Sequence, residues 1–284
     1  MNIRSGELGE WPWSRPGLVV AHRGASGYLP EHTLEAYSMA YGLGADMLEP
    51  DLVLTADDVA ICMHDVHLER VTDVAQRFPG RARTDGRFYA ADFTLDEIRE
   101  LSATGGDRHR FRGCSVPTFQ EFLALVAHLN ERTGREVGIV PELKAPDFHR
   151  REKRPLEEVY VQALREAGYD EPGALCITQS FEPDALVRVR DAGIRSTMLE
   201  LLGGEAPDRS QLAEIAKRAE AIGPSKTMIE ATKGQLVREA HELRLAVIPY
   251  TFKEDEDETR RFFQDHDVDA LFSDFPDVAL RARS

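Results

Sequence analysis

The sequence has few cysteines and no long apolar run. Its three cysteines, Cys62, Cys114 and Cys176, lie far apart, and no Cys-x-x-Cys pair is present. This excludes a disulfide framework and argues against a zinc or redox centre, so we expect reduced thiols. No segment approaches the roughly 18 apolar residues of a membrane span, and residues 1–17 lack the apolar core of a secretory signal. We therefore expect a cytoplasmic protein without stable membrane insertion, or a periplasmic or secreted one if a leader was removed.

The sequence is also poor in positive charge. Among 284 residues, 35 Lys and Arg stand against 50 Asp and Glu, which gives a formal net charge of −15. Nucleic acids and anionic membrane surfaces attract proteins that carry a net basic face. The charge argues against both as the main partner, and the sequence leaves the oligomeric state open. The densest acidic run, residues 254–258, is typical of a solvated helix start, because acidic side chains suit the positive end of the helix dipole.

Short apolar runs alternate with helical patterns along most of the chain. The runs that we predict to be strands are Leu18–Ala21, Met47–Leu54, Val59–Met63, Val137–Leu143, Ala174–Thr178, Arg195–Leu199, Ala221–Ile229, Leu245–Tyr250 and Ala270–Phe272. Parallel strands covered on both faces have this appearance. Strand followed by helix, repeated seven or eight times, predicts a parallel α/β fold, either a doubly wound sheet or a closed barrel of about 250 residues.

Helix signals separate the strand runs. Thr94 with Glu97 and Thr118 with Glu121 form capping boxes, and Thr33 and Gly44 stand where the caps of another helix belong. The segment 65–113 is long, rich in Arg, Asp and Gly, and contains only one good helix pattern. It therefore reads as an insertion between two elements of the main fold.

Polar residues occur at four predicted strand ends, where apolar ones would be expected. They are His22-Arg23-Gly24, Glu49-Pro50-Asp51, His64-Asp65 and Glu142-Leu143-Lys144. Residues i and i+2 of a strand point to one face, so Glu49 projects with Asp51 and Glu142 with Lys144. In a parallel barrel the carboxyl ends of the strands open onto one mouth, where active sites lie.

These residue types suit one chemistry. Glu49, Asp51 and Glu142 offer carboxylates without thiols, which favours a hard divalent cation, Mg²⁺ or Ca²⁺. His22 and His64 can transfer protons near neutral pH. Arg23 and Lys144 can neutralise phosphate oxygens. Each group alone is more often a capping histidine or a surface pair, but their joint occurrence predicts metal-assisted cleavage of a phosphate ester.

The same residues carry a resemblance to a known family. The run Ala21–Thr33 resembles the opening motif of the glycerophosphodiester phosphodiesterases. Further matches follow in the family's order: Gly44–Asp46, Glu49-x-Asp51, Thr55, His64-Asp65 with Leu68 and Arg70, Glu142-x-Lys144, Gln179–Phe181 and Phe272–Pro276. The resemblance extends from about residue 17 to 280.

The resemblance implies a TIM (β/α)₈ barrel over residues 17–280, with residues 65–113 as an inserted module after the second strand. It also implies a set of roles. Glu49, Asp51 and Glu142 match the metal ligands, His22 and His64 the general acid and base, and Arg23 and Lys144 the phosphate-binding positions. Phe181 and Phe252 match part of the wall against glycerol. The expected reaction is hydrolysis of a glycerophosphodiester, such as glycerophosphocholine, to glycerol 3-phosphate and an alcohol.

Two alternatives remain open at this point. One keeps the barrel and changes the reaction to that of a sphingomyelinase D-like or phosphoinositide phospholipase C-like enzyme. The net charge of −15 speaks against the basic rim that a lipid surface would attract. The other alternative is a non-catalytic barrel that binds phosphate esters. The presence of both histidines and all three carboxylates disfavours it.

Overall fold

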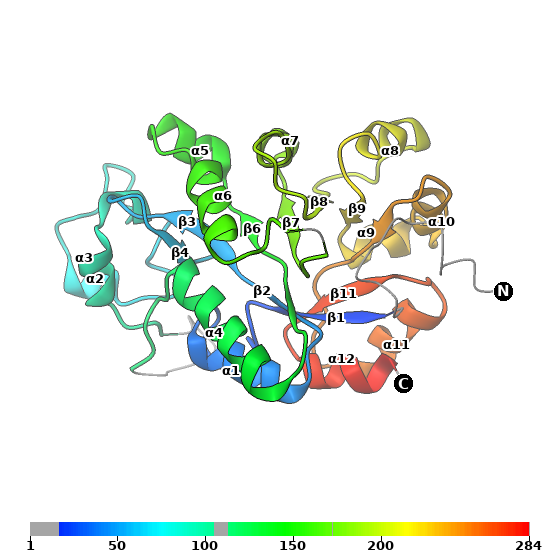
Figure 1. The fold of residues 1–284 in the computed structure, drawn as a ribbon, viewed down its shortest axis with the longest axis horizontal. Helices are drawn as coiled ribbons and strands as arrows, with labels where there is room; N and C mark the ends of the chain where they lie inside the picture. The colour runs from blue at the N-terminus through cyan, green and yellow to red at the C-terminus, as the bar shows by residue number, and fades with distance from the viewer. Residues whose placement is uncertain (1–16, 105–112, 172, 284) are drawn as a thin grey trace.

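The computed structural model describes residues 17–104, 113–171 and 173–283. The strands are β1 (Leu18–His22), β2 (Met47–Glu49), β3 (Asp51–Leu54), β4 (Ala60–Cys62), β5 (Gly138–Ile139), β6 (Glu142–Leu143), β7 (Ile177–Ser180), β8 (Thr197–Leu201), β9 (Ala221–Gly223), β10 (Ala246–Val247) and β11 (Ala270–Ser273). Helices lie outside these strands (Figure 1). They are α1 (Leu34–Leu43), α2 (Val74–Arg77), the 3₁₀ helix η1 (Ala90–Asp92), α3 (Leu95–Arg99), α4 (Phe119–Thr133), α5 (Pro146–Arg151), α6 (Leu156–Glu166), α7 (Pro183–Asp191), α8 (Arg209–Ile215), α9 (Lys226–Ala231), α10 (Gln235–Glu242), α11 (Glu256–Gln264) and α12 (Pro276–Arg283).

The strands are hydrogen bonded in two sheets, in the orders β11-β1-β2-β5 and β10-β9-β8-β7-β6-β3-β4. Pro50 separates β2 from β3, and Pro141 separates β5 from β6, because proline has no N–H to donate to a ladder. The chain nevertheless continues its pairing across both prolines: the amide of Glu142 donates to the carbonyl of Pro50 at 2.8 Å. Further backbone bonds join the segment after β10 to β11, for example from the amide of Phe252 to the carbonyl of Phe272 at 2.8 Å.

Both faces of the strands are buried. In β1, Leu18 and Val20 belong to one apolar cluster, and Val19 and Ala21 belong to a second cluster that includes residues of the surrounding helices. This explains why the strands read as continuous apolar runs rather than as alternating patterns. Parallel strands with helices outside them confirm the predicted TIM-type α/β fold.

The local helix signals are confirmed at several ends. Thr94 and Thr118 form capping boxes at α3 and α4, and Thr33 caps α1, which ends at Gly44 with φ 101°. The acidic run also behaves as expected, because Asp255 caps α11 and the acidic residues after it form its first turn.

Two strand predictions are wrong. The run Ala221–Ile229 is a strand only as far as Gly223, because Ser225 caps helix α9 by accepting a hydrogen bond from the amide of Met228. The apolar side chains of that helix lie in the core, so their burial resembled that of a strand. The run Val59–Met63 forms β4, which pairs with β3 in the antiparallel sense rather than the parallel one.

The segment after β4 has its own apolar cluster. Phe93, Ile98 and Leu101 pack there against Val53 and Ile61 of the β3–β4 hairpin. Helices α2 and α3 lie beside this hairpin, at one end of the molecule (Figure 1). The segment after β4 therefore packs its apolar side chains against the β3–β4 hairpin.

Membrane-spanning helices and disulfides can be assessed for the described residues. None of their helices is both long and apolar enough to cross a membrane. The cysteines are free thiols, with Cys62 and Cys176 buried and Cys114 partly exposed.

Candidate active site

The strand register places candidate residues side by side. His22 lies opposite Glu49 in the ladder between β1 and β2, and Asp51 lies opposite Glu142 in the ladder between β3 and β6. Glu142 in turn lies opposite Gln179 of β7. Because neighbouring strands are only about 4.8 Å apart, the register alone brings these side chains to one edge of the fold.

His64 reaches this edge by a route that the sequence did not predict. We expected it at the carboxyl end of a parallel strand, but β4 runs back along β3. The amide of Met63 donates to the carbonyl of Asp51 at 2.9 Å, so the chain leaves the hairpin beside the start of β3. The antiparallel return, rather than the rule for parallel strands, therefore places His64 at the mouth.

Three buried carboxylates converge in the site. Glu49, Asp51 and Glu142 each offer an oxygen, and these atoms lie within 4.8 Å of one another. Their residues are 1%, 0% and 6% exposed. Burial together with the charge of Asp51 raises the pKa of Glu49 well above its ordinary value, and burial raises the pKa of Glu142 to about 8 despite the opposing effect of Lys144. The positive charges around Glu49 and Glu142 therefore do not fully compensate the burial of these carboxylates.

This arrangement fits a divalent cation. Oδ1 of Asp51 is buried and has no hydrogen-bond partner, which leaves an acceptor for a metal ion. All three ligands are hard oxygens, as Mg²⁺ and Ca²⁺ require, and no cysteine lies among them.

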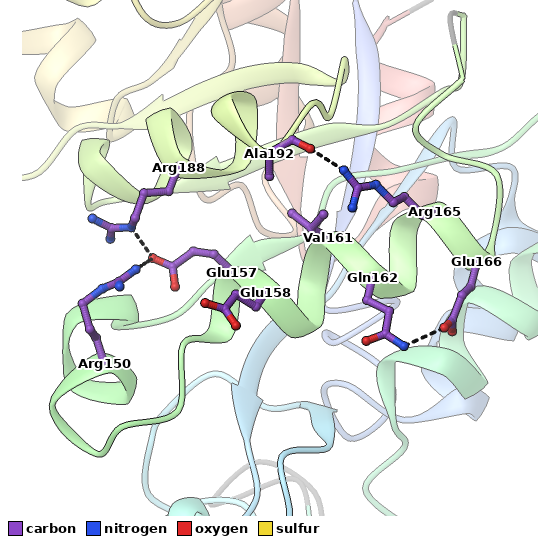
Figure 2. Close-up of a pocket in the computed structure, with 9 residues that line it drawn as sticks. All are labelled: Arg150, Glu157, Glu158, Val161, Gln162, Arg165, Glu166, Arg188 and Ala192. Carbon is purple, nitrogen blue, oxygen red and sulfur yellow. Dashed lines mark hydrogen bonds and ion pairs between the residues drawn. The ribbon is translucent and has the colours of Figure 1, made fainter.

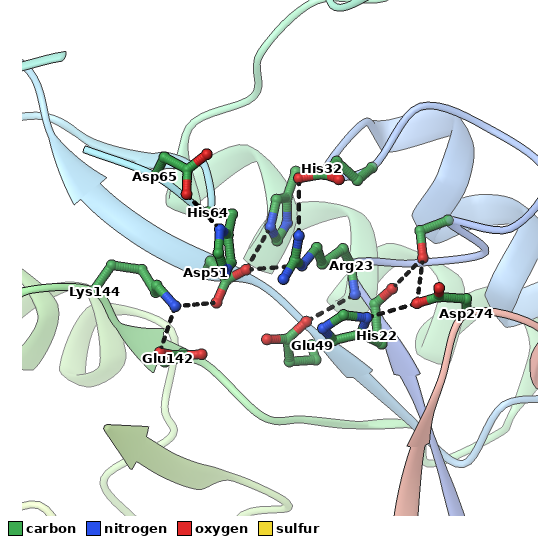
Figure 3. A network of polar contacts seen from close by, with 12 residues as sticks. His22, Arg23, His32, Glu49, Asp51, His64, Asp65, Glu142, Lys144 and Asp274 are labelled. Carbon is green, nitrogen blue, oxygen red and sulfur yellow. Dashed lines mark hydrogen bonds and ion pairs between the residues drawn. The ribbon is translucent and has the colours of Figure 1, made fainter. Parts of the chain in front are cut away.

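Two cations stand among the carboxylates (Figure 3). The backbone amide of Arg23 donates to Oε2 of Glu49 at 2.7 Å, and its Nε lies 3.2 Å from Oδ2 of Asp51. Nζ of Lys144 lies 2.7 Å from Oε1 of Glu142 and 3.8 Å from Oδ1 of Asp51. Burial alone would raise the pKa of Asp51. The positive charges of Lys144 and Arg23, together with a hydrogen bond donated by His32, nevertheless hold this pKa well below its usual range. Of the three carboxylates, Asp51 is thus the one whose neighbours favour its ionised form.

Each of the two histidines is oriented by a carboxylate. Nδ1 of His22 lies 2.7 Å from Oδ1 of Asp274, and Nδ1 of His64 lies 2.6 Å from Oδ1 of Asp65. The carboxylate only accepts, so Nδ1 carries the proton in each pair and Nε2 is left for a substrate. Burial, together with the charge of Arg23, lowers the pKa of His22 despite its bond to Asp274.

The turn that carries His22 and Arg23 depends on Gly24. Arg23 and Gly24 both have left-handed backbone conformations, with φ 60° and 82°. A Cβ on Gly24 would lie 2.7 Å from the backbone carbonyl carbon of Ala36 in α1, which cannot move without shifting the helix.

We therefore expect Gly24→Ala to destabilise the protein, by about 1–3 kcal/mol for the overpacking alone and more for the positive φ. Urea denaturation of both proteins measures the difference. Gly42→Ala is the matched control, because Gly42 lies in α1 with open space around it. It should leave stability unchanged or raise it by up to about 1 kcal/mol. Equal stabilities of the two variants would contradict the role given to Gly24.

Phe181 and Phe252, the two aromatic residues predicted to form the wall against glycerol, lie in different environments. Phe181 is 44% exposed, its ring lies 5.9 Å from that of Tyr250, and Nζ of Lys144 lies 5.7 Å from its centroid. It thus lies beside the site. Phe252 is fully buried and packs edge-on against Phe262 of α11, with ring centroids 4.8 Å apart. The structure does not bring Phe252 together with the other site residues, because its side chain fills the layer between strands and helices.

Sequence reasoning gave no role to three residues that hold the site together. Asp274 follows the apolar run of β11, so its position after a strand end was a usable signal. Gln179 donates to Oε1 of Glu49 at 3.2 Å. His32 is buried, and its Nε2 donates to Oδ2 of Asp51 at 2.8 Å. His32 lies in the loop between β1 and α1, where no pattern of the sequence indicates its direction.

A groove between α6 and α7 lies apart from this site (Figure 2). Its polar centre is Glu157, which accepts hydrogen bonds from Arg150 at 2.9 Å and from Arg188 at 2.6 Å. The residues that line the groove include none of those at the strand ends. Glu157 of α6 therefore pairs with Arg150 of α5 and with Arg188 of α7, and these ion pairs link the three helices.

The chain is similar in sequence and in fold to known glycerophosphodiester phosphodiesterases. A glycerophosphodiester phosphodiesterase of Haemophilus influenzae is 31% identical, with 93% of this chain and 88% of the relative covered. One of Bacillus subtilis is 30% identical, with 92% and 84% covered. A crystal structure from Silicibacter pomeroyi superposes with a TM-score of 0.78 at 26% identity, with 95% and 94% covered. An Oleispira antarctica phosphodiesterase, solved with the product sn-glycerol-3-phosphate, has a TM-score of 0.76 at 22% identity, with 94% and 96% covered, and supports the fold.

Residues 22–278 match the glycerophosphoryl diester phosphodiesterase family, a range that contains every site residue described above. The chain therefore belongs to the glycerophosphoryl diester phosphodiesterase family and is an enzyme of that class.

Proposed function

We propose that this enzyme hydrolyses glycerophosphodiesters to glycerol 3-phosphate and an alcohol, with one bound Mg²⁺ or Ca²⁺. The observation that carries the proposal is the convergence of three buried carboxylates with two histidines, each held at Nδ1 by its own carboxylate. The similarity of the Oleispira antarctica phosphodiesterase, solved with sn-glycerol-3-phosphate, supports the choice of product.

Glu49, Asp51 and Glu142 are the residues that would hold the metal ion. Bound there, the ion would supply positive charge to a phosphate oxygen and to the charge that develops during cleavage. Relief of the unbalanced charge among the buried carboxylates favours its binding.

Arg23 and Lys144 would bind the phosphate. Both contact carboxylates in the structure, and both are largely buried, with side chains 16% and 14% exposed. A buried guanidinium and ammonium bind an anion more strongly than exposed ones, because less water competes. Phe181, exposed at the same edge, offers an apolar surface to the carbon atoms of glycerol.

Proton transfer falls to His22 and His64. Nε2 of one ring removes the proton of the attacking hydroxyl, whether this belongs to water or to the neighbouring glycerol hydroxyl. The new P–O bond forms as the bond to the alcohol breaks, and the second ring, protonated at Nε2, gives its proton to the leaving oxygen. With the glycerol hydroxyl as nucleophile, water then opens the cyclic phosphate.

In this proposal residues 17–280 form one catalytic domain, and residues 65–113 are a module inserted into it. The separate apolar cluster built on the β3–β4 hairpin supports that division.

A coupled assay tests the proposal. Purified protein is given glycerophosphocholine or glycerophosphoethanolamine, and glycerol 3-phosphate is detected with glycerol 3-phosphate dehydrogenase through NADH. We expect metal-dependent formation of NADH with at least one substrate. Turnover of sphingomyelin or a phosphoinositide alone would identify a phospholipase instead, and binding without any turnover would identify a non-catalytic barrel.

A further inference from the structure

Arg70 connects the loop after β1 with the segment after β4. It lies in the second of these and contacts two carboxylates, Glu31 of the loop and Asp65 of its own segment. We propose that Arg70 is a positioning residue, whose guanidinium fixes Asp65 behind His64 and ties it to Glu31 behind Arg23. This inference rests on the proposed function of His64.

The hydrogen bonds of Arg70 form a continuous bridge. Its terminal nitrogens donate to both oxygens of Glu31, at 2.6 and 3.1 Å, and its Nε donates to Oδ2 of Asp65. Glu31 also accepts from Arg23 at 3.1 Å, and Asp65 accepts from Nδ1 of His64 at 2.6 Å. One planar side chain thus links a proposed phosphate ligand to a proposed proton-transfer group.

The bridge fixes the plane of the Asp65 carboxylate. Oδ1 holds His64 and Oδ2 holds Arg70, so rotation of the carboxylate would break one bond or the other. A carboxylate held at one oxygen only can rotate, and the imidazole that it orients can turn with it. A planar guanidinium suits the task, because it donates in several fixed directions at once.

No strand ladder provides this connection. His64 follows β4, which pairs with β3, whereas Arg23 follows β1, which pairs with β2 and β11. Glu31 is ionised for the contact: although burial raises its pKa, the hydrogen bond from Arg70 and the charge of Arg23 lower it to about 2. Arg70 therefore provides a side-chain cross-link between the loop after β1 and the segment after β4.

The first experiment compares Arg70→Met with Arg87→Met. Arg87 lies in the same segment and also pairs with a carboxylate, Glu69, but no hydrogen bond or ion pair among the described residues joins its side chain to Glu31, His64 or Asp65. We expect Arg70→Met to lower kcat about 10- to 100-fold, as loss of an orienting partner typically does. KM should change less, because Arg23 keeps its contacts to Glu49 and Asp51. Arg70→Lys, which keeps the charge but loses the fork, should restore only part of kcat.

The second measurement does not depend on turnover. A long-range ¹H–¹⁵N spectrum, with His64 assigned from the spectrum of His64→Ala, reports which ring nitrogen carries the proton. We expect Nδ1–H in the wild type and a mixture of tautomers in Arg70→Met, with no such change in Arg87→Met. Glu31→Gln, which keeps the shape of the side chain, should show an intermediate effect and serves if Arg70→Met does not fold.

Two outcomes would overturn the inference: a kcat of Arg70→Met within threefold of that of Arg87→Met, or an unchanged His64 spectrum in both Arg70→Met and Glu31→Gln. Failure of the proposed function looks different. In that case His64→Ala itself would keep full turnover, while the spectrum would still report whether Arg70 orients the ring.

Discussion

Replacing either His22 or His64 with alanine is expected to lower turnover by about 10²- to 10⁴-fold, the usual contribution of a positioned acid or base. Each ring is held at Nδ1 by a carboxylate, Asp274 or Asp65, so Nε2 is the nitrogen that faces the reaction. His22 is the last residue of β1 and His64 follows β4, and neither belongs to an apolar core cluster, so the fold should persist. The coupled assay gives the rates, and thermal unfolding gives the stability.

The control for these variants is His128→Ala. His128 is exposed on α4, away from the strand ends, so its loss should leave turnover unchanged. Near-full activity in a folded His22→Ala or His64→Ala protein would remove that residue from the mechanism. A loss that accompanies unfolding in all three variants would count as structural.

Removal of divalent metal is expected to abolish turnover completely. Dialysis against EDTA should give an inactive protein, and Mg²⁺ or Ca²⁺ should restore activity. Asp51→Asn should weaken the binding of the ion in calorimetry, since Asp51 supplies a buried oxygen that has no hydrogen-bond partner. Asp257→Asn is the control, because Asp257 belongs to the acidic run at the start of α11 and its side chain is 93% exposed.

Full activity after exhaustive chelation would overturn the metal role, as would equal affinities of Asp51→Asn and the wild type. If Asp257→Asn alone weakened binding, the ion would belong to the surface run instead. Ligand distances in a metal-bound crystal would identify the ion, since about 2.1 Å indicates Mg²⁺ and about 2.3–2.6 Å indicates Ca²⁺.

The protein has a net charge of −15, but positively charged side chains gather at the site. An anionic phosphodiester approaches an acidic protein, yet Arg23, Arg70 and Lys144 stand at the mouth. Salt screens the field of distant surface carboxylates over roughly 10 Å, so a bound phosphate would meet mainly the charges of the site itself. There the proposed metal ion would balance Glu49, Asp51 and Glu142, and the three cations would add to its attraction for the phosphate. Total charge therefore argued against nucleic acid as a partner but did not describe the site.

The chain alone determined whatever depends on neighbours a few residues apart. The capping boxes at Thr94 and Thr118 join groups three positions apart, and the structure has both. The pairing of Glu142 with Lys144 is likewise local. Ala221–Ile229 shows the limit: burial makes strand and helix equally apolar, and only the Ser225 cap separates them.

Tertiary structure decided everything that depends on register and on the direction of a strand. Asp51 meets Glu142 because β3 pairs with β6 in one register, and His22 meets Asp274, 252 positions away, across β1 and β11. His64 arrives through an antiparallel return that no periodicity indicates, since a strand reads the same in either direction. Phe252 lies in the core for a related reason: the sequence showed its type, but only packing determined which face it covers.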